Sequence, residues 1–132
     1  MKILIACDVL IDFAQDRLPF SEAASKVFSW TEDHPGQAAI AWHTCANLFY
    51  ICGSESRFFL QDLIRYVDIA AVATTGFAGA LSFQMADLED AMQAAAALSF
   101  GAAFIVTRNV KDYSRSPVKA ISPVEFARRN VT

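Results

Sequence analysis

The feature that most constrains the fold is an alternation of short, mostly apolar segments with longer amphipathic ones. Apolar runs of strand length occupy residues 2–6, 37–41, 68–72, 103–107 and 118–120. Helical spacing predicts helices over residues 21–32, 42–51, 76–84 and 87–100, with further helices beginning at Ser54 or Ser56 and after Ser122. Strands that are apolar throughout are typical of a parallel sheet covered on both faces. We therefore expect an α/β fold, a three-layer α/β/α sandwich with a central parallel sheet, in one domain over residues 1–132.

Capping and breaking residues support these boundaries. Ser21 is expected to cap the first long helix, and the His34-Pro35-Gly36 sequence to end it. Gly101 is expected to stop the Ala-rich helix. Ser122-Pro123-Val124-Glu125 is a capping box with proline at the first helical position, which predicts a final short helix.

Composition excludes several classes of protein. Hydrophobic residues make up 55% of the 132 and charged residues 19%, which excludes a disordered chain. No stretch approaches the ~18–20 unbroken apolar residues of a membrane span, so no membrane partner is expected. The apolar surplus, with eleven Phe, predicts a homo-oligomer, most simply a dimer. Cys7, Cys45 and Cys52 form no CxxC pair, which indicates free thiols in a reducing, cytoplasmic setting.

Charge is unevenly distributed along the chain. The net charge of the whole is −3, but residues 1–100 hold five Lys or Arg against twelve Asp or Glu, and residues 101–132 hold six against two. A basic C-terminal quarter beside an acidic remainder suits a phosphate backbone next to a metal site. An ordinary solvated surface is the simpler interpretation.

Polar side chains follow several of the predicted strands. Because the carboxyl ends of parallel strands meet at one edge of a sheet, these side chains and those at the start of the 87–100 helix should converge. The set comprises Cys7, Asp8, His43, Thr44, Asn47, Asp87, Glu89, Asp90, Thr107, Arg108, Asn109 and Asp112. Clustered carboxylates repel unless a cation neutralises them, and Mg²⁺ or Mn²⁺ prefers oxygen ligands. The sequence has no GxxxxGK[ST], GxGxxG or GxSxG motif, so nucleotide-cradling loops and a serine nucleophile elbow are not indicated.

Four segments in register resemble PIN-domain (PilT N-terminus) nucleases over essentially the whole chain. Residues 3–12 (ILIACDVLID), followed by RLPF at 17–20, resemble the family's opening strand and D-x-[ND]-[VI]-[LI]-[LI]-D signature. Residues 87–93 (DLEDAMQ) resemble its D-x-E-D-A-x-Q helix start. Residues 105–113 (IVTRNVKDY) and 121–126 (ISPVEF) resemble its vTRNxkDF and ltPeEF segments.

The resemblance implies a Mg²⁺- or Mn²⁺-dependent ribonuclease, often the toxin of a prokaryotic toxin–antitoxin pair, with RNA and an antitoxin protein as partners. By the same resemblance, Asp90 is a metal-binding acid, Asp112 is the acid after the fourth strand, and Thr107 and Asn109 shape that loop. Two departures stand out. The acid at the end of the first strand is Ala6 here, and the glutamate often found after the second strand is Asn47, which one PIN subgroup shares.

Two functions follow. The first is an endoribonuclease in which Asp8, Asp90 and Asp112 hold the metal, Asn47 and Asp87 support it, and Arg108 and Lys111 contact RNA phosphate. The second is a degenerate PIN domain that binds RNA or a protein without cleaving, because removing one acid weakens the hold on the cation. A phosphoacceptor receiver domain fits poorly, since its lysine and acidic pair are missing.

Simpler interpretations accompany each residue. Asp87 suits a helix cap, Asp8 and Asp112 suit turns, and Asp12 and Asp16 suit a solvated surface. Arg108 and Lys111 equally suit an ordinary surface. The aromatic side chains are expected to make core or dimer contacts rather than stack on bases; these are Phe49, Tyr50, Phe58 and Phe59.

Overall fold

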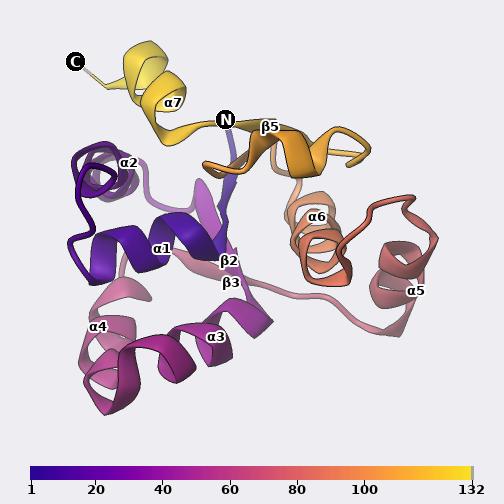
Figure 1. Cartoon of the computed structure of the whole chain (residues 1–132), viewed down its shortest axis with the longest axis horizontal. Coiled ribbons are helices and arrows are strands. Elements are labelled where there is room, and N and C mark those ends of the chain that lie inside the picture. Colours follow the sequence, from indigo (N-terminus) through magenta and orange to yellow (C-terminus); the bar gives the residue numbers. More distant parts are fainter. Residues whose placement is uncertain (132) are drawn as a thin grey trace.

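A single five-stranded sheet organises the chain in the computed structural model, which describes residues 1–131 (Figure 1). Its order is β3-β2-β1-β4-β5, and each adjacent pair is parallel. The strands are β1 (Ile3–Ile5), β2 (Ala38–Ala41), β3 (Asp68–Ala70), β4 (Phe104–Val106) and β5 (Lys119–Ile121). The predicted parallel α/β class is therefore confirmed. β1, β3 and β4 are each two residues shorter than expected, β2 is one residue shorter, and β5 is shifted by one.

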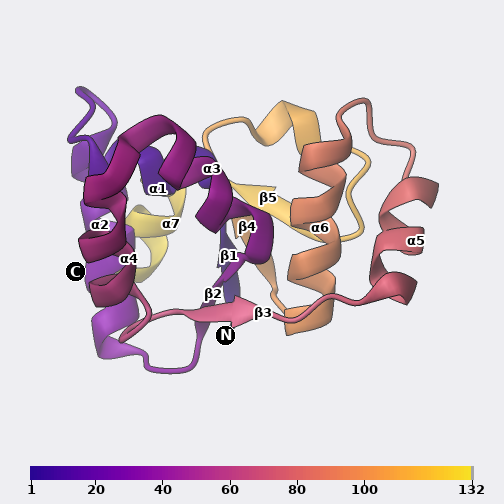
Figure 2. The same ribbon diagram turned by 90° about the horizontal axis from the view of Figure 1, so that it is seen from below.

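Helices cover both faces of this sheet. They are α1 (Cys7–Ala14), α2 (Ser21–Asp33), α3 (Trp42–Cys52), α4 (Ser56–Leu63), α5 (Thr74–Ser82), α6 (Leu88–Phe100) and α7 (Pro123–Asn130), with short 3₁₀ turns η1 (Gly53–Glu55) and η2 (Val110–Tyr113). Figure 2 shows α1, α2, α4 and α7 on one side of the sheet and α6 on the other. Helix α5 packs on the outside of α6 and not on the sheet. None of the helices in residues 1–131 combines the length and apolarity needed to cross a membrane.

Successive side chains of β1 point to opposite faces of the sheet and belong to two separate hydrophobic cores. Ile3 and Ile5 pack with the helices α1, α2 and α7, whereas Leu4 packs with α6 on the opposite face. The facing side of α6 is built of alanines, whose small side chains allow the helix to lie close to the sheet. The two cores leave the carboxyl ends of the strands as the place where polar side chains gather.

Helix ends agree with the sequence at three positions and differ at two. The Oγ of Ser122 accepts from the Glu125 N–H at 3.1 Å, as the capping box predicts. Asp87 caps α6 through Oδ1, and Gly101 ends it with φ +77°. The predicted cap at Ser21 is wrong, because Ser21 is a buried residue of α2 and makes no capping bond. Ser56 likewise begins α4 after the η1 turn and caps nothing.

Helix α1 follows β1 with a single residue between them, and it changes the environment of Asp12. The sequence pattern favours a solvated surface for Asp12. Asp12 is instead 1% exposed, since helical spacing places it one turn after Asp8 on the inner side of α1. That expectation is wrong, and the reason is an ion pair with a residue near the opposite end of the chain.

Candidate functional site

A cavity of about 410 Å³ opens at the carboxyl ends of β1 and β4. Its walls come from the β1–α1 junction, α3, the start of α6, and the loop after β4. The side chains that matter for its chemistry are Ala6, Cys7, Asp8, Arg17, Asn47, Tyr50, Glu89, Asp90, Thr107, Asn109 and Tyr113. The convergence expected from the parallel sheet is thus present for Asp8, Asn47, Asp90, Thr107 and Asn109.

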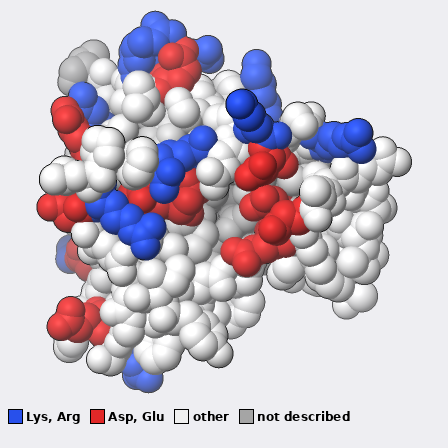
Figure 3. Space-filling view, in the orientation of Figure 1, with Lys and Arg blue, Asp and Glu red and all other residues white. Residues whose placement is uncertain are grey.

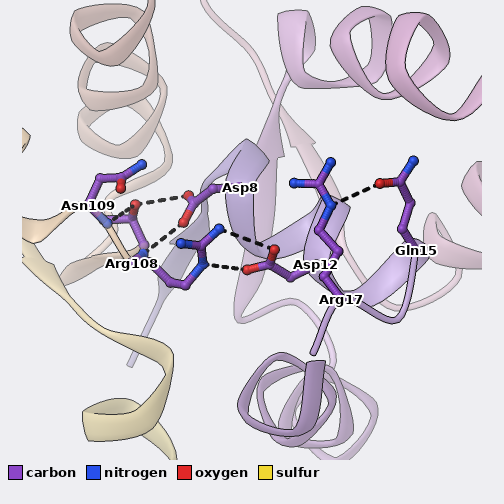
Figure 4. Close-up of polar contacts among 7 residues, drawn as sticks. Asp8, Asp12, Gln15, Arg17, Arg108 and Asn109 are labelled. Atoms are coloured by element: carbon purple, nitrogen blue, oxygen red, sulfur yellow. Dashed lines mark hydrogen bonds and ion pairs between the residues drawn. The ribbon is translucent and has the colours of Figure 1, made fainter. Parts of the chain in front are cut away.

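Asp8 is held by the loop after β4 through both of its carboxylate oxygens (Figure 4). The Thr107 hydroxyl donates to Oδ1 at 2.9 Å, and the Arg108 N–H donates to Oδ2 at 2.8 Å. The Thr107 oxygen in turn accepts from the Asn109 N–H at 3.1 Å. Burial raises the pKa of Asp8, and the bonds from Arg108 and Thr107 oppose that rise. Asp8 therefore joins two strand ends.

Arg108 is engaged inside the protein. Its Nε donates to Asp12 Oδ2 at 2.6 Å and its Nη2 to Oδ1 at 3.2 Å, while its guanidinium lies 3.8 Å from the centre of the Phe20 ring. The bond to Asp12 raises the pKa of Arg108. Figure 4 shows Asp12 and Asp8 side by side, both bound to the Arg108 segment. An RNA contact by this guanidinium, as the sequence analysis expected, would have to compete with a two-bond ion pair.

The acids of α6 also have internal partners. Tyr113 donates from its hydroxyl to Asp90 Oδ1 at 3.2 Å, and Asn47 donates from Nδ2 to Glu89 Oε1 at 2.8 Å. Asp87 accepts from the Asp90 N–H as the cap of the helix. Burial and then the charge of Asp87 raise the pKa of Asp90. Tyr113 itself is 5% exposed, and burial together with the charge of Asp90 raises its pKa.

Asp112 and Lys111 lie beside this cavity rather than in it. Both line a neighbouring hollow of about 350 Å³ together with Arg115. The negative charge of Asp112 still contributes to raising the pKa of Asp90. Figure 3 shows the acidic side chains as a patch next to a hollow in the middle of this face, with basic side chains on either side. The structure thus brings Asp8 and Asp90 into one cavity and leaves Asp87 and Asp112 at its edge.

Sequence reasoning missed Arg17, Tyr50 and Tyr113 as residues of this cavity. Glu89 was expected at this edge of the sheet but was given no role, although it binds Asn47. Tyr113 takes the place of the phenylalanine that ends the family's vTRNxkDF segment. Its additional hydroxyl was the signal that could have identified it as a residue of the cavity. Arg17 was not singled out, and Tyr50 was assigned to core or dimer contacts although it is 87% exposed on the cavity wall.

A site for Mg²⁺ or Mn²⁺ needs several oxygen ligands grouped at one point, and the side chains of this cavity can be tested against that requirement. Position 6 offers a methyl group that is 2% exposed, and both oxygens of Asp8 already accept bonds from protein donors. Within residues 1–131, no three His, Cys, Asp or Glu side chains are grouped as a metal ion needs. The residues of this cavity do not fit a tightly held Mg²⁺ or Mn²⁺.

The chain combines a parallel α/β sheet with an acidic cavity at the carboxyl ends of its strands, and known proteins share this fold. The family model described as "PIN domain" matches residues 2–111. The chain belongs to the PIN-domain family. No curated protein sequence shows significant similarity to it.

Solved structures share the fold at low sequence identity. VapBC2 from Rickettsia felis, bound to a DNA fragment from its promoter, matches with a TM-score of 0.70 at 13% identity, over 92% of this chain and 98% of that one. VapBC-1 from nontypeable Haemophilus influenzae gives 0.70 at 17%, over 94% and 99%. A toxin–antitoxin complex from Klebsiella pneumoniae gives 0.66 at 19%, over 92% and 98%. At such identities the likeness establishes the fold.

Proposed function

We propose that this protein is a PIN domain that binds single-stranded RNA and that alanine at position 6 disables its cleavage chemistry. The observation that carries the proposal is the cavity itself. It gathers Asp8, Asn47, Asp90, Thr107 and Asn109, which the resemblance assigns to a nuclease site, but Ala6 is apolar and each Asp8 oxygen already accepts a hydrogen bond from the protein.

Basic side chains around the cavity support RNA as the ligand. Arg17 lines its mouth, and Lys111 and Arg115 line the adjoining hollow. None of the three forms an ion pair within residues 1–131. Phosphates on both sides of a central nucleotide would therefore meet cations, while the acids between them face the middle of the strand. Binding should accordingly weaken as salt rises.

The loss of cleavage rests on the acids that remain. A catalytic Mg²⁺ or Mn²⁺ would supply an activated water and stabilise charge on the phosphate, but it needs several free carboxylate oxygens at one point. Among the carboxylates that line the cavity, Asp90 Oδ2 and Glu89 Oε2 are the oxygens without a protein donor within the described chain. One such oxygen on each of two side chains makes a weak site.

Ribonuclease activity of the chain as it stands is the second candidate. In that case Asp8, Asp90 and Asp112 hold Mg²⁺ or Mn²⁺, supported by Asn47 and Asp87. The observation in its favour is the grouping of negative charge, since Asp112 and Asp87 both act on the pKa of Asp90. This activity requires Asp8 to exchange its bonds with Thr107 and Arg108 for the cation.

Protein partners form a separate part of the proposal. Large apolar side chains remain exposed, among them Leu18 at 82% and Trp42 at 77%, which supports association with an antitoxin-type protein or a second copy in the cytoplasm. Light scattering tests the dimer: a monomer mass at high concentration contradicts it, and a dimer mass that Trp42→Glu reduces supports it.

Fluorescence anisotropy with a labelled oligouridine tests the function. In EDTA the protein should bind the strand, with an affinity that falls steeply as salt rises. With Mn²⁺ added, the strand should stay intact with this chain and be cut by Ala6→Asp, with Ala6→Asp/Asp90→Asn as the control for contaminating nuclease. Absence of binding at low salt contradicts RNA as the ligand. Mn²⁺-dependent cutting by the unaltered chain, lost in Asp90→Asn, supports the second candidate instead.

A further inference from the structure

Arg17 and Tyr50 occupy the mouth of the acidic cavity and have no other task in the described structure. Arg17 comes from the loop between α1 and α2, and Tyr50 comes from α3, which packs against α1. We propose that these two side chains form a nucleotide-binding mouth, in which Arg17 binds an RNA phosphate and Tyr50 stacks on the adjoining unpaired base. The inference rests on the proposed function and assigns two residues to it.

The guanidinium of Arg17 is held in place by one hydrogen bond, and its two terminal nitrogens are available to a ligand within the described structure. Its Nε donates to Gln15 Oε1 at 2.9 Å, which leaves both terminal nitrogens without a partner within residues 1–131. Figure 4 shows the group beside Gln15 and turned away from Asp12. A guanidinium with both terminal nitrogens free matches two oxygens of a phosphate group.

The backbone around Arg17 is fixed by hydrogen bonds. Its N–H donates to the Asp12 carbonyl at 2.9 Å, and its carbonyl accepts from Phe20 N–H at 2.8 Å and Ser21 N–H at 2.7 Å. These bonds hold the residue at the mouth without help from its side chain. Changing the side chain should therefore alter binding and leave the fold intact.

Within residues 1–131, Arg17 is the one cationic side chain that lines this cavity. The other nearby arginine, Arg108, is paired with the buried Asp12 and covered by Phe20. Arg17 also lines the adjoining cavity of about 660 Å³ bounded by Gln15, Glu55 and Phe59. It therefore stands on the wall between two hollows, where a phosphate joining two nucleotides would be reached from either side.

Tyr50 supplies the aromatic surface. Its side chain is 87% exposed, and the hydroxyl makes no hydrogen bond within residues 1–131. An exposed ring at the edge of a cavity can stack on any base, which gives binding with little sequence preference. Stacking needs an unpaired base, so the mouth is suited to single-stranded RNA rather than to a duplex.

Anisotropy titrations of oligouridine in EDTA test the pair. Arg17→Gln should weaken binding by about tenfold and reduce the salt slope by about 0.7, the value for one phosphate contact on a single strand. Tyr50→Ala should weaken binding by about tenfold without changing that slope, and Tyr50→Phe should bind as the parent does. A duplex RNA should bind more weakly and should not respond to Tyr50→Ala.

Matched controls come from α4. Arg57→Gln removes an exposed cation and Phe58→Ala an exposed aromatic ring, and neither residue lines this cavity. Both controls should bind as the parent does. Equal losses of RNA binding in Arg57→Gln and Arg17→Gln would overturn the assignment. Unchanged RNA binding in both Arg17→Gln and Tyr50→Ala would also overturn it, even if those variants lost a protein partner. If the parent chain binds no RNA, the proposed function itself is wrong, and this outcome is distinct from failure of the assignment.

Discussion

Asp8 and Thr107 are 99 residues apart in sequence, and the Thr107 hydroxyl donates to Asp8 Oδ1 at 2.9 Å. The bond joins the first turn of α1 to the residue that directly follows β4. The Arg108 N–H donates to the other oxygen of Asp8. Together the two bonds make Asp8 a structural link between the end of β1 and the end of β4. A PIN-type rim without the first-strand acid is thus held together by direct hydrogen bonds.

Thr107→Val should destabilise the protein by about 1–3 kcal/mol, because the loss leaves a half-buried carboxylate oxygen of Asp8 and the Asn109 N–H without their partner. Urea unfolding followed by circular dichroism measures the change. Thr75→Val is the control, since Thr75 is exposed on α5, and it should stay within about 0.5 kcal/mol. Equal stability of the two variants would show that the Asp8 link contributes little.

Asp12→Asn should cost about 2–3 kcal/mol, since it places an amide against the Arg108 guanidinium at a site that is 1% exposed. Arg108 is 31% exposed on its side chain, so water limits the penalty. Arg65→Gln, which breaks an exposed pair with Asp62, is the comparison and should change stability by less than about 1 kcal/mol. A small effect of Asp12→Asn would mean that the pair is not structurally important.

Asp90 predicts a particular dependence of stability on pH. Its pKa is raised in the folded protein, first by burial and then by Asp87, so the folded state holds this proton more tightly than the unfolded state does. Ionisation of Asp90 therefore opposes folding increasingly as pH rises above its ordinary pKa of 3.8. Asp90→Asn should therefore gain stability relative to the parent as pH rises above about 4.

Urea titrations at several pH values measure that difference. Asp33→Asn, at an exposed position at the end of α2, supplies the comparison. A difference between Asp90→Asn and the parent that stays constant, or that turns against the variant as pH rises, would contradict the raised pKa.

Cys7 should alkylate slowly in the folded protein. Burial is the largest cause that raises its pKa to about 12, so only about one thiol in ten thousand is ionised near pH 8. Iodoacetamide labelling followed by peptide mass spectrometry should show Cys7 protected in buffer and modified in urea. Rapid labelling of Cys7 in the folded state would contradict the raised pKa of its thiol.

The parallel sheet and most element positions could be predicted from the sequence because each strand is an apolar run with a clear break. The caps at Ser122 and Asp87 could also be predicted, because each capping hydrogen bond joins two residues that are three apart in the sequence. The buried state of Asp12 could not be predicted in this way. Its partner Arg108 lies 96 residues along the chain, and only the pairing of β1 with β4 brings the two together.

The candidate site was predictable in position and less so in chemistry. The rule that parallel strands present their carboxyl ends at one edge was enough to group Asp8, Asn47 and Asp90. That rule does not say which carboxylate oxygens accept hydrogen bonds from the protein. Those hydrogen bonds decide whether a carboxylate is free to bind a cation. The bonds from Thr107 to Asp8 and from Tyr113 to Asp90 depend on side-chain directions that appear only in three dimensions.

The central claim is that position 6 decides whether this rim holds a cation. Isothermal titration with Mn²⁺ of the parent chain, Ala6→Asp, the neutral isostere Ala6→Asn and Ala6→Asp/Asp90→Asn tests it most directly, with the thermal shift caused by Mn²⁺ as a second readout. We predict one bound Mn²⁺ and a raised Tm for Ala6→Asp, and neither for the other three. Binding by the parent chain as tight as that of Ala6→Asp would contradict the claim, as would a folded Ala6→Asp protein that binds none.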